Sequence, residues 1–314
     1  MTQYLIRRFL ISIVTLVAIS IVVFGILSLA PGDPLGEFAT NPSVPVAVRQ
    51  QIRKQMGLDD PISVQYVKWG QNYIQGNWMR SFTAKSDVRP IVLGRLPTTI
   101  YIIGSSFLLS LLIAIPIGVL SAIKQYSVFD QASTTFAFLG FSLPTFFTGL
   151  LFITLFSVKL GWLPFVYDST THGFFLWIKQ AIMPISVLAL FSSASLTRFV
   201  RASMLEVINQ DYVRTARAKG LRERVVIVGH AMRNGMIPVV TIIALQIPEV
   251  FGGAIVTEQI FRVPGIGSLL IASVNSKDTP VIMAITFGIA IIVVVCNVFA
   301  DVLYALLDPR IKLS

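Results

Sequence analysis

Six long apolar runs constrain this chain more than any other feature of its sequence. Five of them contain no Asp, Glu, Lys or Arg, and the remaining one contains only Glu249. About 20 consecutive apolar residues cross a bilayer as a helix, so each run predicts one membrane span. The predicted spans are residues 9–30, 98–123, 131–158, 180–197, 234–257 and 279–300. The sequence therefore predicts an all-α integral membrane protein with six transmembrane helices.

Composition agrees with a membrane protein and gives its orientation. Charged residues make up 13% of the chain, against about 25% in soluble proteins, and the mean hydropathy is +0.77. The net charge of +10 lies in segments that flank apolar runs rather than on one solvated face, so it does not indicate nucleic-acid binding. Outside residues 31–97, thirteen Lys and Arg residues lie on one side of the predicted spans and four on the other. The positive-inside rule then predicts both termini in the cytoplasm.

The runs divide the chain into three parts. Residues 1–30 form an N-terminal tail and the first span, and residues 31–97 form a polar extracytoplasmic insert. Residues 98–314 form a five-helix core that includes a cytoplasmic loop at 201–238. Within the insert we expect two short helices, at about 44–57 and 61–76. The sequence Asp59-Asp60-Pro61 predicts the start of the second, with an acidic cap and Pro at the first helical position.

The loop at 201–238 is the longest charged stretch between two apolar runs. Leu205, Ile208 and Tyr212 recur in it at helical spacing, and Gly220 stands where a residue just past a helix end is expected. Charged side chains cover the other faces. This pattern predicts an amphipathic helix between two spans, although an ordinary basic inner loop is the alternative.

Several motifs resemble those of one family. The pattern AxxxG from Ala216 to Gly220, inside DYVRTARAKGL and followed by Ile237-Pro238, resembles the signature loop of binding-protein-dependent ABC importer permeases. The broader superfamily has Glu-Ala-Ala where this chain has Arg214-Thr215-Ala216, and its Pro follows the Gly sooner; both differences resemble the dipeptide/oligopeptide branch. GGAIVTEQIF, FRVPGIGSLL and the final Asp-Pro-Arg extend the resemblance over the whole chain. The resemblance implies the type I ABC importer permease fold.

This resemblance also implies partners and a site. In the family the signature loop is a coupling helix seated in a groove of an ATPase subunit, and we expect Tyr212 and Ala216 to offer the apolar contact. The implied ATPase-coupling residues are Asp211, Tyr212, Arg214, Thr215, Ala216, Arg217, Lys219 and Gly220. The implied partners are a second homologous permease, two P-loop ATPase subunits and an extracytoplasmic solute-binding protein. The implied location is the bacterial cytoplasmic (inner) membrane, within a lipid bilayer.

The chain carries no recognisable catalytic motif. It has no GxxxxGK[ST] phosphate loop, so ATP and Mg would be bound by partner ATPase subunits rather than by this chain. A single Cys296 allows no intrachain disulfide, and the isolated His172 and His230 predict no metal site. We therefore expect a non-enzymatic translocation subunit without a cofactor of its own.

Three residues within the spans are candidates for the translocation path. Glu249 is a charge at membrane depth, which costs about 2.5–3.5 kcal/mol on insertion scales and usually faces a bundle interior or a wet cavity. It follows Pro248, and Pro144 interrupts the third run, so both prolines are expected to break or kink their helices. The alternatives are a paired carboxylate that fixes helices and a kink that serves packing alone.

Peptides are the substrates that the resemblance implies, because the motifs match the peptide branch. Nickel, glutathione and an opine are alternatives within the same family. A secondary carrier driven by an ion gradient is a different class, but such carriers usually need intramembrane carboxylates and often have internal repeats. One such carboxylate, Glu249, and no recognisable repeat are present. A membrane scaffold without transport would leave Glu249 and the Pro-interrupted spans unexplained.

Overall fold

The computed structural model describes residues 2–29, 45–168 and 173–307, and every regular element within them is helical. Two segments, at Ile153–Lys159 and Val226–Met232, are π-helical. The α-helices are α1 (Thr2–Leu29), α3 (Val46–Met56), α4 (Ile62–Ile74), α5 (Val88–Ile123), α6 (Val128–Ser142), α7 (Thr145–Phe152), α8 (Phe174–Ile208), α9 (Asp211–Ala218), α10 (Glu223–Val225), α11 (Arg233–Ile260), α12 (Ile266–Asn275) and α13 (Thr279–Leu307).

Five helical segments of the described chain are long and apolar enough to cross a membrane. They are Ile6–Leu29, Val88–Ile123, Phe175–Ile208, Glu223–Pro248 and Thr279–Val302. A sixth span is present if Val128–Ser142 and Thr145–Lys159, which meet at a bend of 104°, are counted as one broken span. The prediction of an all-α protein with six spans is confirmed on that count. The bend lies at Leu143-Pro144, where the sequence predicted a break.

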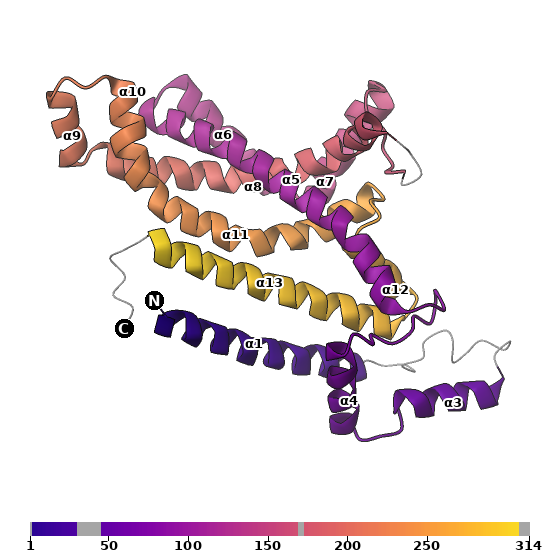
Figure 1. The fold of residues 1–314 in the computed structure, drawn as a ribbon. Coiled ribbons are helices and arrows are strands. Elements are labelled where there is room, and N and C mark those ends of the chain that lie inside the picture. The colour runs from indigo at the N-terminus through magenta and orange to yellow at the C-terminus, as the bar shows by residue number, and fades with distance from the viewer. Residues whose placement is uncertain (1, 30–44, 169–172, 308–314) are drawn as a thin grey trace. The chain divides into compact units, whose positions relative to one another are not determined.

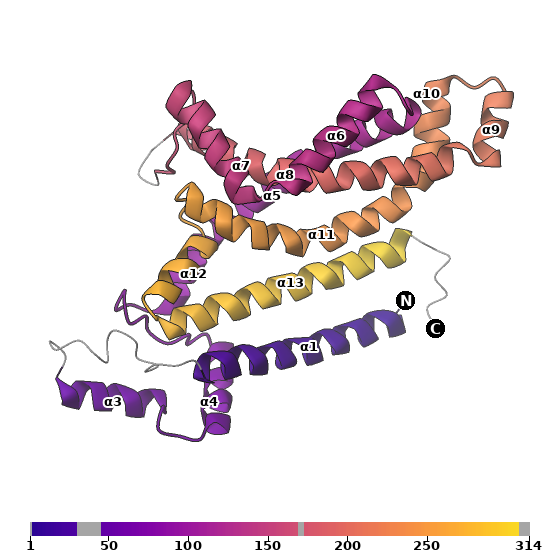
Figure 2. The same ribbon diagram turned by 180° about the vertical axis from the view of Figure 1, so that it is seen from behind.

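The chain forms two compact units. Among the described residues, the first contains 2–5, Ile100–Val263 and 296–307, and the second contains Ile6–Thr99 and Pro264–Val295. In the first unit, α8 lies between α6 and α11 in both views (Figures 1 and 2). One of its cores joins α5, α8 and α11 through fully buried side chains such as Ile102, Leu188 and Ala254. These three helices form the framework that carries the loop at 201–238.

Three helices begin, end or continue differently from what the sequence predicted. Helix α5 begins at Val88, within the predicted insert. Pro90 lies in its first turn, where a backbone N–H would have no acceptor within the helix. The proline, which lacks an N–H, is therefore tolerated there. Helix α8 continues past the charged Arg198 and Arg201 to Ile208. Helix α11 runs unbroken through Pro248, so the expected interruption there is wrong. Neighbouring helices commonly satisfy the backbone groups that a proline frees within a span.

In the second unit, α4 crosses the end of α1 in both views (Figures 1 and 2). The hydroxyl groups of Ser20 and Tyr66 join these helices at 2.7 Å. Phe24 of α1, Trp69 of α4 and Met283 of α13 form a small buried cluster beside this contact. The two helices expected in the insert are therefore present, and aromatic packing holds α4 against the neighbouring helices of its unit.

The cap expected for α4 differs in detail. Pro61 itself is the N-cap residue, with φ −55° and ψ 144°, and no side chain caps the helix. Asp60 instead accepts a hydrogen bond from Nζ of Lys68 at 2.6 Å, and its backbone carbonyl accepts one from the amide of Gln65. The prediction that Asp60 caps the helix is therefore wrong. Its carboxylate pairs with Lys68, two turns into the helix, and a charged donor is a stronger partner than a backbone N–H at the helix start.

A short segment between α4 and α5 is anchored by a buried carboxylate. Asp278, which is 2% exposed, accepts hydrogen bonds from the Ser81 hydroxyl at 2.5 Å and from the N–H groups of Phe82 and Thr83 at 3.2 Å each. Arg80 and Asp87 form an isolated β-bridge that closes the segment. Asp278 thus attaches residues 80–87 to the turn between α12 and α13.

Asp278→Ala should release this segment. The change leaves one hydroxyl and two N–H groups without their charged acceptor, so we expect a local loss of about 2–3 kcal/mol. Hydrogen exchange at the amides of Phe82 and Thr83 would then accelerate by about thirtyfold or more. Asp87→Ala is the matched control, because its ion pair with Arg80 is exposed and 3.9 Å long. Equal exchange rates in wild type and Asp278→Ala would show that the carboxylate does not anchor the segment.

Candidate functional site

Helix α9 lies at the end of α8, beside α10, as Figures 1 and 2 show. It is separated from α8 by Asn209 and Gln210, and it buries two side chains one helical turn apart. Val213 is fully buried and Ala216 is 4% exposed. Both belong to a cluster contributed by α5, α8, the π-helical segment and α11, which contains Val119, Met204, Val226 and Val239. The charged helix is therefore packed on its own membrane core.

This arrangement corrects two expectations from the sequence. The predicted single helix is broken at 209–210, so Leu205 and Ile208 belong to α8 whereas Tyr212 belongs to α9. Ala216 faces inward and does not offer an outward apolar contact. Val213, which the sequence analysis did not single out, is its inward neighbour at i−3 spacing. The spacing of Val213 and Ala216, three residues apart between charged residues, was the available signal.

The outward face of α9 carries most of the residues expected to couple. Asp211, Tyr212, Arg214 and Thr215 are exposed, and so are Arg217, Lys219 and Gly220 beyond them. On this face the contact between Arg214 Nη1 and Asp211 Oδ1, at 3.8 Å, is too long and too exposed to fix either side chain. The structure thus presents these side chains to whatever lies outside the loop.

The end of α9 is fixed by backbone conformation and by one ion pair. Gly220 has φ +76°, a conformation that other residues rarely adopt, and its N–H donates to the Arg217 carbonyl at 2.9 Å. The Arg217 guanidinium donates two hydrogen bonds to Glu223, at 2.9 and 3.2 Å. This pairing raises the pKa of Arg217 further above its usual value. The chain is thereby turned back towards α10 and α11.

A buried ion pair connects the base of this loop to α6. Asp130, at the start of α6, is 3% exposed and accepts two hydrogen bonds from Arg201 of α8, at 2.6 and 2.8 Å. The Ser121 hydroxyl and the Tyr126 N–H also donate to its carboxylate. Asp130 therefore joins α5, the turn before α6, and α8 just before the break that leads to α9. No sequence pattern marks this carboxylate, which lies one residue outside an apolar run.

The predicted path residues lie on different elements. Pro144 is the N-cap of α7 at the 104° bend. Its neighbours Leu143 and Thr145 line a largely apolar cavity of about 620 Å³ formed by α5, α6, α7 and α8. Pro248 lies inside α11. Glu249 is in the same helix, but its side chain lies outside what the structure describes.

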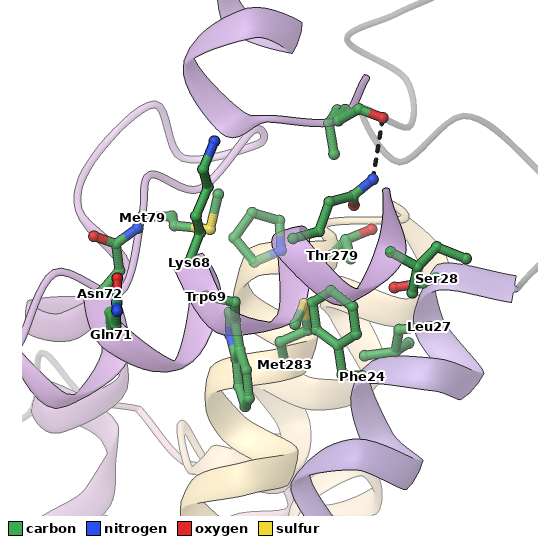
Figure 3. Close-up of a pocket in the computed structure, with 14 residues that line it drawn as sticks. Phe24, Leu27, Ser28, Lys68, Trp69, Gln71, Asn72, Met79, Thr279 and Met283 are labelled. Atoms are coloured by element: carbon green, nitrogen blue, oxygen red, sulfur yellow. Dashed lines mark hydrogen bonds between the residues drawn. The ribbon is translucent and has the colours of Figure 1, made fainter. Parts of the chain in front are cut away.

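A second cavity, of about 280 Å³, lies in the other unit among α1, α4 and α13 (Figure 3). Phe24, Trp69 and Met283 form its apolar side, and Lys68 stands at its polar side (Figure 3). Among its lining residues, Lys68 alone has an acidic or basic side chain, so this cavity has no acid–base pair. Within the described residues, no group of three or more His, Cys, Asp or Glu side chains is placed to hold a metal ion.

Comparison with known families decides what kind of protein this is. A model described as "Binding-protein-dependent transport system inner membrane component" matches residues 114–313, and a model of the corresponding N-terminal part matches residues 1–103. The chain belongs to this family. It is accordingly a permease subunit of an ABC transporter and a multi-pass membrane protein, as the resemblance at DYVRTARAKGL indicated.

Named relatives match the permease along nearly its whole length. The oligopeptide transport system permease protein AppB of Bacillus subtilis is 45% identical, over 99% of this chain and 100% of the relative. A putative peptide permease protein of Brucella suis is 39% identical, over all of both chains. A probable peptide ABC transporter permease protein of Sinorhizobium fredii is 34% identical, over 99% of this chain and 100% of the relative.

One solved structure shares the fold of the permease. It is described as an amino acid ABC transporter with histidines, and it matches with a TM-score of 0.51 at 15% identity. The match covers 71% of this chain and 94% of that chain. At this identity the likeness establishes the architecture of the helical core alone.

Proposed function

We propose that this permease is the translocation subunit of an ATP-driven importer that takes up peptides delivered by an extracytoplasmic solute-binding protein. The observation that carries the proposal is α9, a charged helix whose inward side is packed on the membrane core and whose outward side is exposed. Because α9 packs on α8 and α11, a movement imposed on α9 from outside the membrane is transmitted to these two helices. Peptides are proposed as the solute because the named relatives are called peptide or oligopeptide permeases.

The outward face of α9 is proposed to dock in a groove of an ATPase subunit. Tyr212, which is 41% exposed, supplies apolar contact there, together with Leu221 and Val225 in the same loop, at 41% and 48%. Arg214 and Lys219 add charge, but exposed ion pairs contribute only about 0–1 kcal/mol each. Shape and apolar contact therefore determine most of the affinity. ATP and Mg are bound and used by the ATPase subunits in this scheme, and this chain has no catalytic role.

The remaining partners follow from the same scheme. A second, homologous permease completes the path across the bilayer, and two ATPase subunits serve the pair. The location is the bacterial cytoplasmic (inner) membrane with both termini in the cytoplasm, which agrees with the excess of Lys and Arg near α9. Glu249, Pro144 and Pro248 are proposed to line or shape the path. Nickel, glutathione or an opine would be the solute if the binding protein selects them.

Purification of the tagged permease in mild detergent tests this proposal. We expect a sibling permease and P-loop ATPases to be recovered with the wild type, and the ATPases to be lost from Gly220→Trp. A Cβ at Gly220 meets nothing within 4 Å in its own chain, so the tryptophan side chain clashes with nothing in the permease, and its effect there is the backbone strain of φ +76°.

The control for this experiment is Gly220→Asn. Asparagine tolerates the positive φ of this position at a smaller cost than other residues and adds little bulk. It should keep the ATPases bound, and both variants should insert at wild-type levels. Retention of the ATPases by Gly220→Trp, or recovery of a lone permease, would contradict the docking role of the loop.

A further inference from the structure

The cavity of about 280 Å³ among α1, α4 and α13 lies at the ends of two membrane spans. All of its lining residues belong to the second unit. Phe24 and Ser28 of α1 line it within about 8 Å of Leu29, where the first span ends. Met283 of α13 lines it about 6 Å from Thr279, where the last span begins. The cavity therefore lies where the hydrocarbon core of a bilayer meets the headgroups.

Helix α4 lies against the end of α1 at this level. The hydroxyl of Tyr66 meets that of Ser20 at 2.7 Å, and Ser20 comes nine residues, or about 13 Å, before Leu29. Trp69, one turn along α4, is 8% exposed and packs on Phe24 with the ring centroids 5.7 Å apart. Trp and Tyr side chains are enriched at the interfaces of a membrane. Helix α4 thus covers the cavity at the depth of the headgroups.

Polar side chains with unused hydrogen-bonding capacity line the cavity beside its apolar wall (Figure 3). In the described part of the chain, no hydrogen bond joins the side chains of Ser28, Gln71 or Asn72 to another group. The side chain of Lys68 is 55% exposed, and its Nζ donates to Oδ2 of Asp60 at 2.6 Å. An ammonium group has three donors, so others remain for a ligand. The lining therefore offers a cation and amide groups next to aromatic rings.

An exposed apolar strip of α1 continues from the cavity into the span. Ile13, Val17, Ser20 and Phe24 follow one another at intervals of three or four residues, so they lie on one face of the helix. Phe24 lines the cavity, whereas Val17 and Ile13 are 48% and 43% exposed. Val17 lies about 10 Å deeper in the span than Phe24. A hydrocarbon chain that descends from the cavity would follow this strip.

A phospholipid has the same order of chemical groups along its length. Its anionic phosphate lies at the level of the headgroups, and its apolar chains extend into the hydrocarbon core. A phosphate oxygen accepts a charge-assisted hydrogen bond from an ammonium group, which is stronger than a bond between neutral groups. We propose that the cavity binds the phosphate of a membrane glycerophospholipid through Lys68, and that one acyl chain of this lipid follows Val17 and Ile13.

Lipid retention by the delipidated permease assembly in detergent, measured by native mass spectrometry, tests this site. The probes are dioleoylphosphatidylglycerol, inorganic phosphate, and dioleoylglycerol, which has the same chains but no phosphate. We expect the phospholipid to bind at least about tenfold more tightly than dioleoylglycerol, because its hydrogen bond with Lys68 joins two charged groups. Inorganic phosphate should bind more weakly than the phospholipid, because it lacks the apolar chains. Equally tight binding of inorganic phosphate would indicate a site for a free anion instead.

Two variants separate the cation from its ion pair. Lys68→Gln and Asp60→Asn both break the pair, but only Lys68→Gln removes the cation. Lys68→Gln should abolish the preference for the phospholipid, whereas Asp60→Asn should retain it. Both variants should fold, because the pair is exposed. Lys85→Gln removes an exposed lysine that does not line the cavity, so it should bind both lipids as the wild type does.

Three results with the lipid probes would overturn the site. They are equal binding of phospholipid and dioleoylglycerol to the wild type, an unchanged preference in Lys68→Gln, and equal losses in Lys68→Gln and Asp60→Asn. Thiol cross-linking of a Val17→Cys variant to a sibling permease in intact membranes would also overturn it, because a protein would then cover the strip. None of these measurements involves peptide uptake, so failure of the lipid site is distinct from failure of the proposed function.

Discussion

Replacing Asp130 by alanine is expected to lower the free energy of unfolding by about 3–5 kcal/mol, because it leaves Arg201 as an uncompensated charge in a largely buried position. The carboxyl of Asp130 is 4% exposed and the Arg201 side chain 26%. The change also removes the acceptor for Ser121 and for the Tyr126 N–H. Because the pair joins α6 to α8 next to the coupling loop, transport should fall with stability.

Denaturant titration of the purified permease in detergent measures the change in the free energy of unfolding. Asp87→Ala should change the unfolding free energy by less than about 1 kcal/mol, because its ion pair with Arg80 is exposed. The double variant Asp130→Ala/Arg201→Ala should lose less than the sum of the two single variants, since the unpaired charge is then absent. A loss of under 1 kcal/mol in Asp130→Ala would show that the pair does not hold α6 to α8.

Gly118→Ala is expected to destabilise the permease by about 1–3 kcal/mol through overpacking. A Cβ at Gly118 would lie 2.7 Å from Cβ of Val200 and 2.9 Å from the backbone carbonyl of Thr197. The carbonyl belongs to α8 and moves only if the helix moves. Close packing of α5 against α8 therefore requires a glycine at this position.

Gly104→Ala is the control in the same helix and has the opposite expected sign. A Cβ there meets nothing within 4 Å, so the change only reduces the backbone freedom of the unfolded chain. It should stabilise the permease by up to about 1 kcal/mol. Thermal unfolding, monitored through the loss of the monodisperse peak, would distinguish the two variants by their melting temperatures. Equal melting temperatures for Gly118→Ala and Gly104→Ala would contradict the close approach of α5 to α8.

The spans and the site segment were predictable because each depends on a local pattern. Runs without charge mark the spans, Pro144 marks the break in the third, and Gly220 marks the end of α9. DYVRTARAKGL alone indicates the family. Local patterns also predicted both insert helices, although the cap of α4 was wrong because Lys68 and Asp60 meet only once the helix has formed.

Contacts between segments far apart in the chain could not be predicted from local sequence patterns. Asp130 and Arg201 are separated by 71 residues, and Ser81 and Asp278 by 197, so no sequence window contains either pair. The orientation of α9 was also unpredictable. The break at 209–210 lacks a strong helix stop signal, and it changes which residues of α9 face the core relative to an unbroken helix. Ala216 was therefore assigned outward although it packs inward. The roles of Glu249, Pro144 and Pro248 stay predictions.

Uptake of a radiolabelled tripeptide by proteoliposomes tests the central claim most directly. The vesicles contain the permease with its co-purified partners, and the binding protein is added outside. The account predicts uptake that requires ATP in the compartment that α9 faces, stops with a non-hydrolysable ATP analogue, and persists when proton and sodium gradients are collapsed. Uptake by the permease alone, driven by an ion gradient without ATP, would contradict the account and establish an ion-coupled carrier instead.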